Sequence, residues 1–398
     1  TGSGTTGARE LPEEGLRRRE EHLRNEEPAP PPVLSRRGAV LSAIALEPVP
    51  DARRPAAFRV GLPALDAFPL PLWARLNARH WRRAGAELLG YGEPAGYGPL
   101  REAIAAYLGA ARGIRCDAGQ VILVAGSVQA IDLATRLLLD PGDEVWMEDP
   151  GFPAARAGFI GAGARLVPVP VDGEGLDVSA GRAAAGRARL AYVSPSHQFP
   201  LGVTMSLPRR LALLEWAAHT GAWVLEDDYD SEYRYAGRPL AALQGLDHAR
   251  RVIYVGTFSE VLFPALRLGY MVVPRELADR FVTARALADR HSPLIEQAVL
   301  AAFMAEGHFA RHIRRMRLRY RQNLAILVEA VDSLLGGALE ITSEPAGMHL
   351  VGWLPAGVDD EAVCRRLTDA GVEALPLSRY AISPLPRGGL VLGYAGAS

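Results

Sequence analysis

The segment GTFSEVLFPALRLGY, residues 256–270, places one carboxyl group, Glu260, and one guanidinium group, Arg267, between apolar stretches. The pattern predicts the end of one strand, a polar turn and a second apolar strand. A carboxyl group in apolar surroundings has a raised pKa and can exchange protons near neutral pH. A carboxylate paired with Arg267 would instead be one half of an inert ion pair. The sequence leaves both alternatives for Glu260 open.

A second candidate group lies in LEDDYDSEY, residues 225–233, where Asp227 and Asp228 end an apolar stretch and Tyr229 follows. A carboxylate at the edge of a sheet core is costly unless it is paired or hydrogen-bonded. The segment therefore predicts a ligand or a partner side chain at Asp227.

Three further segments carry candidate binding groups after apolar runs. Gly126 and Ser127 in AGSVQ present small residues and free backbone N–H groups where a helix begins, which suits a phosphate. Phe152 in EDPGF offers an aromatic face, and His197 in SPSHQFPLG offers an imidazole. Taken one at a time, these residues are explained more simply as a tight turn, a packing aromatic and a solvated loop residue.

The elements that must position these groups alternate between strand and helix from about residue 56. Apolar runs such as VILVAG (121–126) and AWVLEDD (222–228) are separated by helical stretches such as LPRRLALLEWAAHTG (207–221). This order predicts an α/β fold with a mostly parallel sheet flanked by helices. Ligands of such sheets bind at the carboxyl ends of the strands, where the candidate residues fall.

We predict three regions along the chain: an extended polar N-terminal arm over residues 1–55, a large domain over 56–336 and a smaller α+β C-terminal domain over 337–398. The arm contains the Pro-rich EEPAPPPVLSRRG and a charged stretch, LPEEGLRRREEHLRNEE, that could form a short helix. A long helix is predicted over 308–335. Its basic stretch Arg311–Arg321 is expected to face solvent or a dimer partner.

Composition excludes several classes of protein. The net charge of −1 gives no general attraction to nucleic acid, and no run of about 18 apolar residues could span a membrane. Cys116 and Cys364 lie far apart in no metal-ligand spacing, so we expect reduced thiols in a cytoplasmic protein without a metal site. The chain contains no lysine, so none of its side chains can form a Schiff base with an aldehyde.

Seven segments in order carry a resemblance to a known family: LLGYGEPAGYGPLR (88–101), AGSVQ, EDPGF, SPSHQFPLG, EDDYDSEY, GTFSEVLFPALRLGY and LVLGYAG. They resemble the fold-type-I pyridoxal-phosphate enzymes of aminotransferase class I/II. The chain resembles most the aminotransferase-like domain of the MocR-type GntR regulators, over about residues 56–396. The resemblance implies the large and small domains of that fold and a homodimer with a shared active site.

The resemblance also implies roles for individual residues. Asp227 would pair with the pyridinium nitrogen, Tyr229 would hydrogen-bond the phenolic oxygen of the ring, and Phe152 would stack on the ring face. His197 would lie near the ring oxygen. The residues implied to hold the phosphate are Gly126, Ser127, Ser259, Arg267 and, reaching across to the partner subunit, Tyr91.

Three positions depart from the family pattern. Glu260 stands where the family has the lysine that holds the cofactor covalently, Val261 follows where a small hydroxyl residue is frequent, and Val128 replaces a polar residue of the phosphate loop. The carboxylate-binding arginine of the family aligns with Val391, so an α-amino-acid carboxylate would lose its usual partner. The weaker candidates for substrate contacts in the small domain are His349 and Arg387.

Three hypotheses for function remain. The first is a lysine-less enzyme of specialised, biosynthetic metabolism in which Glu260 is the general acid or base for a small amine- or amino-acid-derived substrate. Pyridoxal phosphate or pyridoxamine phosphate would be bound non-covalently, or no cofactor would be bound. The second is a ligand-sensing pseudoenzyme, and the third is an ordinary aminotransferase carrying an engineered lysine-to-glutamate change. The segment before residue 56 is short for the helix-turn-helix of the regulators, so we expect no DNA contact.

Overall fold

The computed structural model describes residues 33–44, 57–237, 240–342 and 344–397. Most of the predicted arm, including its charged stretch, therefore lies outside the described residues. The chain divides into a unit over residues 1–43 and a unit over residues 44–398. In the first unit, α2 (Arg36–Ser42) begins after Ser35, whose hydroxyl oxygen accepts a hydrogen bond from the Gly38 N–H at 3.0 Å.

The second unit is built on an eight-stranded mixed sheet with the order β1-β8-β7-β6-β5-β2-β3-β4. Its strands are β1 (Val121–Val124), β2 (Glu144–Asp149), β3 (Arg165–Asp172), β4 (Gly175–Leu176), β5 (Leu190–Val193), β6 (Trp223–Asp228), β7 (Val252–Thr257) and β8 (Gly269–Val272). Strands β3, β2, β5, β6 and β7 are parallel neighbours, while β8 runs antiparallel to both β7 and β1. The predicted mostly parallel sheet is confirmed, with β8 and β4 as the antiparallel members.

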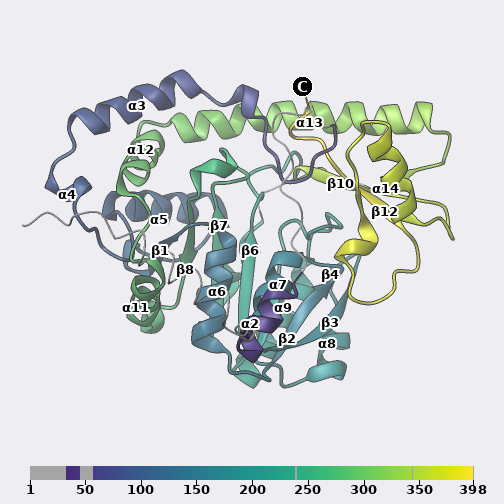
Figure 1. The fold of residues 1–398 in the computed structure, drawn as a ribbon, viewed down its shortest axis with the longest axis horizontal. Coiled ribbons are helices and arrows are strands. Elements are labelled where there is room, and N and C mark those ends of the chain that lie inside the picture. The colour runs from purple at the N-terminus through teal and green to yellow at the C-terminus, as the bar shows by residue number, and fades with distance from the viewer. Residues whose placement is uncertain (1–32, 45–56, 238–239, 343, 398) are drawn as a thin grey trace, which may run out of the picture. The chain divides into compact units, whose positions relative to one another are not determined.

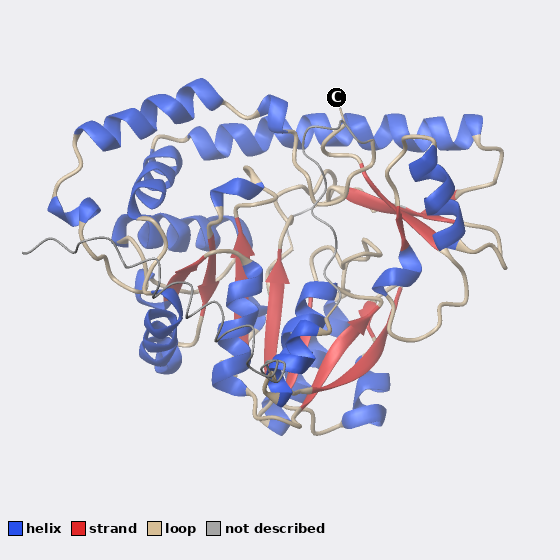
Figure 2. Cartoon of the chain, viewed as in Figure 1, coloured by secondary structure: helices blue, strands red, loops and turns tan. Residues whose placement is uncertain are grey.

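Helices cover both faces of this sheet (Figure 2). The helices that precede α13 (His308–Leu334) in this unit are α3 (Leu70–Arg82), α4 (Ala86–Leu89), α5 (Gly98–Arg112), α6 (Ser127–Leu138), α7 (Pro153–Gly161), α8 (Val178–Ala185), α9 (Leu207–Thr220), α10 (Leu243–Leu246), α11 (Ala278–Asp289) and α12 (Leu294–Ala305). Of these, α3 and α4 pack on α12 rather than on the sheet. Short 3₁₀ turns lie at Leu65–Ala67, Ala118–Gln120, Pro264–Leu266, Arg275–Leu277 and Leu377–Tyr380.

Successive strand residues pack into different cores because strand side chains alternate between the two faces. In β1, Ile122 and Val124 pack in the cluster with α6, α7 and α11, whereas Val121 and Leu123 pack in the cluster with α3, α5 and α12. Both sets are buried, which explains why the strands appear in the sequence as continuous apolar runs rather than alternating ones.

The predicted C-terminal α+β segment forms a second sheet, of order β11-β12-β10-β9, beside the long helix α13 (Figure 1). The long helix is α13 (His308–Leu334), and the elements of the C-terminal segment are β9 (Glu340–Thr342), β10 (His349–Trp353), α14 (Asp360–Asp369), β11 (Leu375–Pro376) and β12 (Gly389–Gly393). Helix α13 confirms the predicted long helix to within one residue. The boundaries at residues 55 and 336 stay predictions, since residues 44–398 form one unit of contacts.

The basic stretch of α13 is used within the chain more than the sequence indicated. Arg315 donates to the carbonyl of Ala67, and Arg319 pairs with Asp66 at 2.9 Å. Arg317 donates to the Glu232 carbonyl at 2.7 Å. These arginines fasten α13 to two loops of the large domain.

Across the described ranges, no helix combines the length and the apolar character that a bilayer span requires.

A buried ion pair ties α5 to the end of β6. Arg112 Nη2 lies 2.7 Å from Asp228 Oδ2, and the Tyr254 hydroxyl donates to the same carboxylate at 2.6 Å. Both charged side chains are almost completely buried. Removing the guanidinium leaves a buried carboxylate without its counter-ion, which typically costs several kcal/mol.

We therefore expect Arg112→Met to lower the free energy of unfolding by roughly 3–5 kcal/mol, measured by urea denaturation. The control is Arg136→Met, which removes an exposed i,i+4 pair with Asp132 on α6 and should cost about 0.5 kcal/mol or less. Equal losses in the two variants would show that burial does not set the strength of the Arg112–Asp228 pair.

Candidate active site

A cavity of about 200 Å³ lies in the second unit at the carboxyl ends of the parallel strands. The predicted site residues that line it are Ser127, Phe152, Asp227, Tyr229, Glu260 and His349. Further lining residues are Tyr192, Ser194, Phe199, Met348 and Tyr380. The strand ends of the large sheet thus supply the two carboxyl groups, and the small sheet with its loops supplies His349, Met348, Leu375 and Tyr380.

Asp227, at the end of β6, is a buried carboxyl group with one free acceptor atom. The Tyr192 hydroxyl donates to Oδ2 at 2.5 Å, while Oδ1 is buried and has no hydrogen-bond partner. Burial raises the pKa of Asp227 to about 7, the Tyr192 hydrogen bond lowers it, and the charge of Asp228 raises it. Buried polar atoms are nearly always paired, so Oδ1 is available to a hydrogen-bond donor of a ligand.

Glu260 lies in the turn after β7 and lines the same cavity. Its Oε2 is buried without a hydrogen-bond partner. Burial raises the pKa of Glu260 to about 7, its own backbone N–H lowers it, and the charge of Asp227 raises it. The sequence left open whether Glu260 is a proton-exchanging carboxyl group or one half of an ion pair with Arg267. Among the described residues, Glu260 and Arg267 form no ion pair.

An anion-binding corner forms where α6 begins. Gly126 has a φ of +129°, and a Cβ there would lie 3.4 Å from Nη2 of Arg267, so the arginine crosses close to the glycine backbone. Arg267 is exposed and has no side-chain partner among the described residues. Ser259 is buried nearby in sequence, with its N–H donating to the Thr257 hydroxyl at 3.1 Å. A helix N-terminus beside a free guanidinium suits a phosphate.

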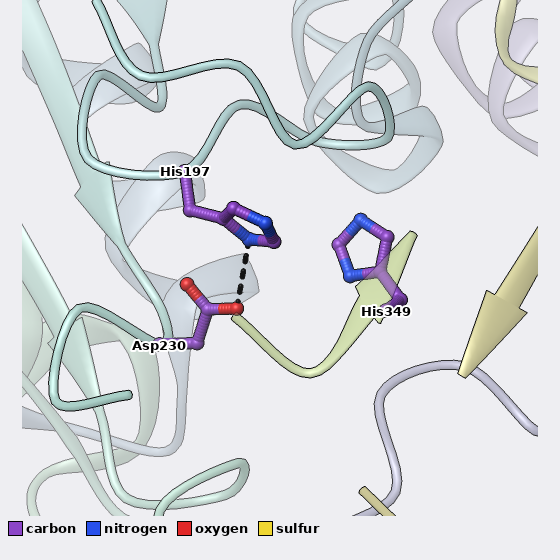
Figure 3. Close-up of side chains that lie close together, drawn as sticks. All are labelled: His197, Asp230 and His349. Carbon is purple, nitrogen blue, oxygen red and sulfur yellow. Dashed lines mark hydrogen bonds and ion pairs between the residues drawn. The ribbon is translucent and has the colours of Figure 1, made fainter. Parts of the chain in front are cut away.

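His197 lies behind Tyr229 rather than on the cavity wall. Its Nδ1 is 3.0 Å from the Tyr229 hydroxyl and 3.0 Å from Asp230 Oδ2. Figure 3 shows the contact with Asp230 and the ring of His349 beside it. The ring of His349 lies 4.9 Å from that of His197, and burial, with His197 beside it, holds the pKa of His349 well below 6.5. His349 is therefore a neutral polar group on the cavity wall.

His197, Asp230 and His349 also have the residue types of a metal site, with ligand atoms within 4.8 Å of one another. We interpret them as support for Tyr229, because Nδ1 of His197 already serves both Tyr229 and Asp230. The chain of contacts from Asp230 through His197 orients the tyrosine hydroxyl at the cavity.

Two predicted site residues lie away from the cavity. Arg387 donates to the carbonyl of Leu354 and pairs with Glu340 at 2.7 Å, so it holds the edge of the small sheet and is not a cavity group. Tyr91 is 83% exposed, with the Arg290 guanidinium 4.5 Å from its ring centre. Such exposure leaves Tyr91 available to a second subunit.

The sequence missed two polar residues of this region, Tyr192 and Glu148. Glu148 accepts hydrogen bonds from the Ser194 hydroxyl at 2.8 Å and the Gln198 amide at 3.2 Å, and burial raises its pKa to about 7. Tyr192 interrupts the otherwise apolar β5, and Glu148 follows the buried apolar residues 145–147 of β2 and is itself buried. That interruption was the available signal, since a polar side chain in a buried strand needs a partner.

Comparisons with known proteins are consistent with this geometry. The family model described as aminotransferase class I and II matches residues 58–387. The chain is 43% identical over 366 residues to the "Probable rhizopine catabolism regulatory protein MocR" of Rhizobium meliloti, covering 92% of this chain and 73% of that protein. It is 33% identical over 324 residues to the 2-aminoadipate transaminase of Thermus thermophilus, covering 80% of each.

Solved structures give the same picture. The α-aminoadipate aminotransferase LysN of Thermus thermophilus, complexed with N-(5'-phosphopyridoxyl)-L-leucine, matches with a TM-score of 0.79 and 32% identity. The match covers 85% of this chain and 87% of LysN. The similarity therefore extends over both the large and the small sheet.

The raised pKa of Glu260 has a consequence for stability. The folded-state pKa of about 7 exceeds the ordinary value of 4.5, so the folded state binds the proton more tightly than the unfolded state. The resulting stabilisation is complete below about pH 4.5 and is lost as the pH rises through about 7. Its slope in that window is about 1.4 kcal/mol per pH unit for one group.

We expect Glu260→Gln to match the wild type in stability near pH 5 and to exceed it by roughly 2–3 kcal/mol near pH 8. Urea denaturation at a series of pH values measures the difference. Glu102→Gln, at an exposed position of α5, is the control and should follow the wild type throughout. A Glu260→Gln variant no more stable than wild type at pH 8 would contradict the burial of this charge.

Proposed function

The chain belongs to the aminotransferase class I and II family, and we propose that it binds pyridoxal or pyridoxamine phosphate non-covalently and uses Glu260 as a general acid or base. The substrate is a small amine- or amino-acid-derived molecule. One observation carries this proposal: Glu260 and Asp227 line the same cavity, each with a buried carboxyl oxygen that lacks a partner. The family implies the cofactor, and the absence of lysine precludes its usual covalent attachment.

The residues present fit the cofactor at both of its ends. Asp227 Oδ1 would accept the ring N–H, which satisfies its unpaired oxygen, and Tyr229 would bind the phenolic oxygen. Phe152 provides an aromatic face for the ring. The residues that would hold the phosphate are Gly126, Ser127, Ser259 and Arg267. When bound, the cofactor supplies an electron-withdrawing ring that stabilises negative charge next to the substrate nitrogen.

Glu260 would hold and transfer a proton at Oε2. A pKa of about 7 places the group where both protonation states are populated at neutral pH. Phe199 and Tyr380 pack edge to face at 5.2 Å and add aromatic surface to the cavity wall. His349, neutral and on the same wall, is the polar contact we assign to the substrate. Val391 is buried in β12 and offers no carboxylate-binding group.

A ligand-sensing role is the second candidate function. The 43% identity to the MocR regulatory protein, over 92% of the chain, favours it. In that function the same residues bind the ligand without turnover, and occupancy alters a partner contact. Neither function requires DNA binding by this chain. The two candidates separate on one measurement, since only the enzyme loses turnover when Glu260 is changed to Gln while ligand binding persists.

We expect the wild-type chain to bind pyridoxal phosphate reversibly, so that borohydride treatment leaves its intact mass unchanged. Glu260→Lys should gain the mass of one phosphopyridoxyl group under the same treatment, because it restores an amine at this position. Glu260→Gln is the control and should gain nothing. A covalent adduct on the wild type would refute non-covalent binding. Amino-group transfer by Glu260→Lys would favour the hypothesis of an ordinary aminotransferase altered at one position.

We also propose a homodimer in which Tyr91 reaches the phosphate bound in the partner subunit. Light scattering should give the mass of two chains for both the wild type and Tyr91→Phe. The variant should bind pyridoxamine phosphate about tenfold more weakly, since one hydrogen bond to a charged group is lost. Pyridoxine, which lacks the phosphate, is the control ligand. A monomeric wild type, or unchanged affinity in the variant, would exclude this role for Tyr91.

A further inference from the structure

We propose that the cavity selects pyridoxamine phosphate, the amine form of the cofactor, over the aldehyde form, with Glu260 as the selecting residue. This inference rests on the proposed function and names which form of the cofactor the site takes. It follows from the charges of the cavity wall, the placement of two carboxyl groups and the chemistry of the two ligands.

The cavity wall carries acidic groups without a cation. Asp227 and Glu260 are its carboxyl groups, and no arginine occurs among the described residues that line it. His349, the basic side chain on the wall, is neutral at physiological pH because of its burial. The Arg267 guanidinium lies beside Gly126, in the anion-binding corner, and makes no ion pair with Glu260. The positive charge that balances this wall must therefore come from the ligand.

The two carboxyl groups each present one acceptor oxygen that has no hydrogen-bond donor. Asp227 ends β6, and Glu260 follows the neighbouring strand β7, whose Gly256 pairs with Asp228. Tyr192 satisfies only one oxygen of Asp227, and Oε2 of Glu260 has no partner. A ring N–H that donates to Asp227 satisfies Oδ1. Oε2 of Glu260 still lacks a partner, so a ligand that satisfies both carboxyl groups must carry a second hydrogen-bond donor.

Pyridoxamine phosphate carries such a donor at the required part of the molecule. Its aminomethyl group is attached to the ring carbon opposite the nitrogen, so a ring oriented by Asp227 directs the amine away from that residue. By resemblance to the family, Glu260 occupies the position of the lysine that meets this substituent. An ammonium group there forms a charge-assisted hydrogen bond with the carboxylate.

The aldehyde form meets the opposite situation. Its carbonyl oxygen is an acceptor and carries no charge, so it can form only a neutral hydrogen bond with the protonated form of Glu260. Against the ionised form, two acceptors face each other in a cavity of low polarity. The chain also has no lysine with which the aldehyde could bond covalently. Both effects weaken binding of the aldehyde form relative to the amine form. Pyridoxine phosphate, with a neutral hydroxymethyl donor, should fall between the two.

The test is a calorimetric titration of the full chain, freed of ligand by dialysis, with each of the three phosphates near neutral pH. We expect pyridoxamine phosphate to bind about 10- to 100-fold more tightly than pyridoxal phosphate, with pyridoxine phosphate between them. Glu260→Gln should bring the three affinities within about threefold of one another. Glu260→Lys should reverse the order, because it repels the amine and captures the aldehyde.

The outcomes separate the two levels of inference. Equal affinities in the wild type, or a preference that persists in Glu260→Gln, would overturn the selection of the amine form and leave non-covalent cofactor binding standing. Failure of all three ligands to bind would overturn cofactor binding itself. Thermal unfolding of each variant in the absence of ligand verifies that it is folded, and Glu260→Lys provides a second, independent readout should Glu260→Gln be unstable.

Discussion

The structure is organised around two buried carboxyl groups that face one cavity, whose wall, as far as the described residues form it, carries no cationic side chain. A carboxylate taken out of water needs a donor or a counter-ion, and Asp227 and Glu260 each retain an oxygen that has neither. Burial raises both pKa values to about 7, and neighbouring carboxylates add to the effect: Asp228 at Asp227, and Asp227 at Glu260. The cavity is therefore prepared for a ligand with positively charged hydrogen-bond donors. In this it differs from a site built on lysine, which supplies its own cation.

The fold brings these groups together through strand direction. Strands β6 and β7 are parallel neighbours, so the residues that follow them, Tyr229 and Glu260, meet at one edge. Strand β8 runs the other way, and its amino end brings Arg267 to that edge as well. The buried Arg112–Asp228 pair holds the end of β6 in place one residue from Asp227. Positioning of the ionisable groups is thus a property of the sheet and not of flexible loops.

The family contains both enzymes and regulators, and the same scaffold serves each. The relatives include a regulatory protein at 43% identity and a transaminase at 33% identity, so overall similarity alone does not assign a reaction. What distinguishes this chain is a local replacement. By resemblance to the family, Glu260 would take the place of the covalent anchor and add a negative charge, while Asp227, Tyr229 and Arg267 would still hold the ring and the phosphate. The chemistry of the site therefore depends on Glu260 more than on the fold.

The sequence by itself determined the α/β fold, the long helix near residue 308 and six of the residues that line the cavity, both of its carboxyl groups among them. It could do so because continuous apolar runs and the polar residues at their ends are local signals. It also settled the absence of lysine, which is a matter of composition. Only the tertiary structure decided which side chains pair with one another. It left Glu260 without an ion pair to Arg267, engaged Arg387 at the small sheet, and placed Tyr192 on Asp227. Those outcomes depend on distances between residues far apart in the chain, and neither spacing nor composition contains them.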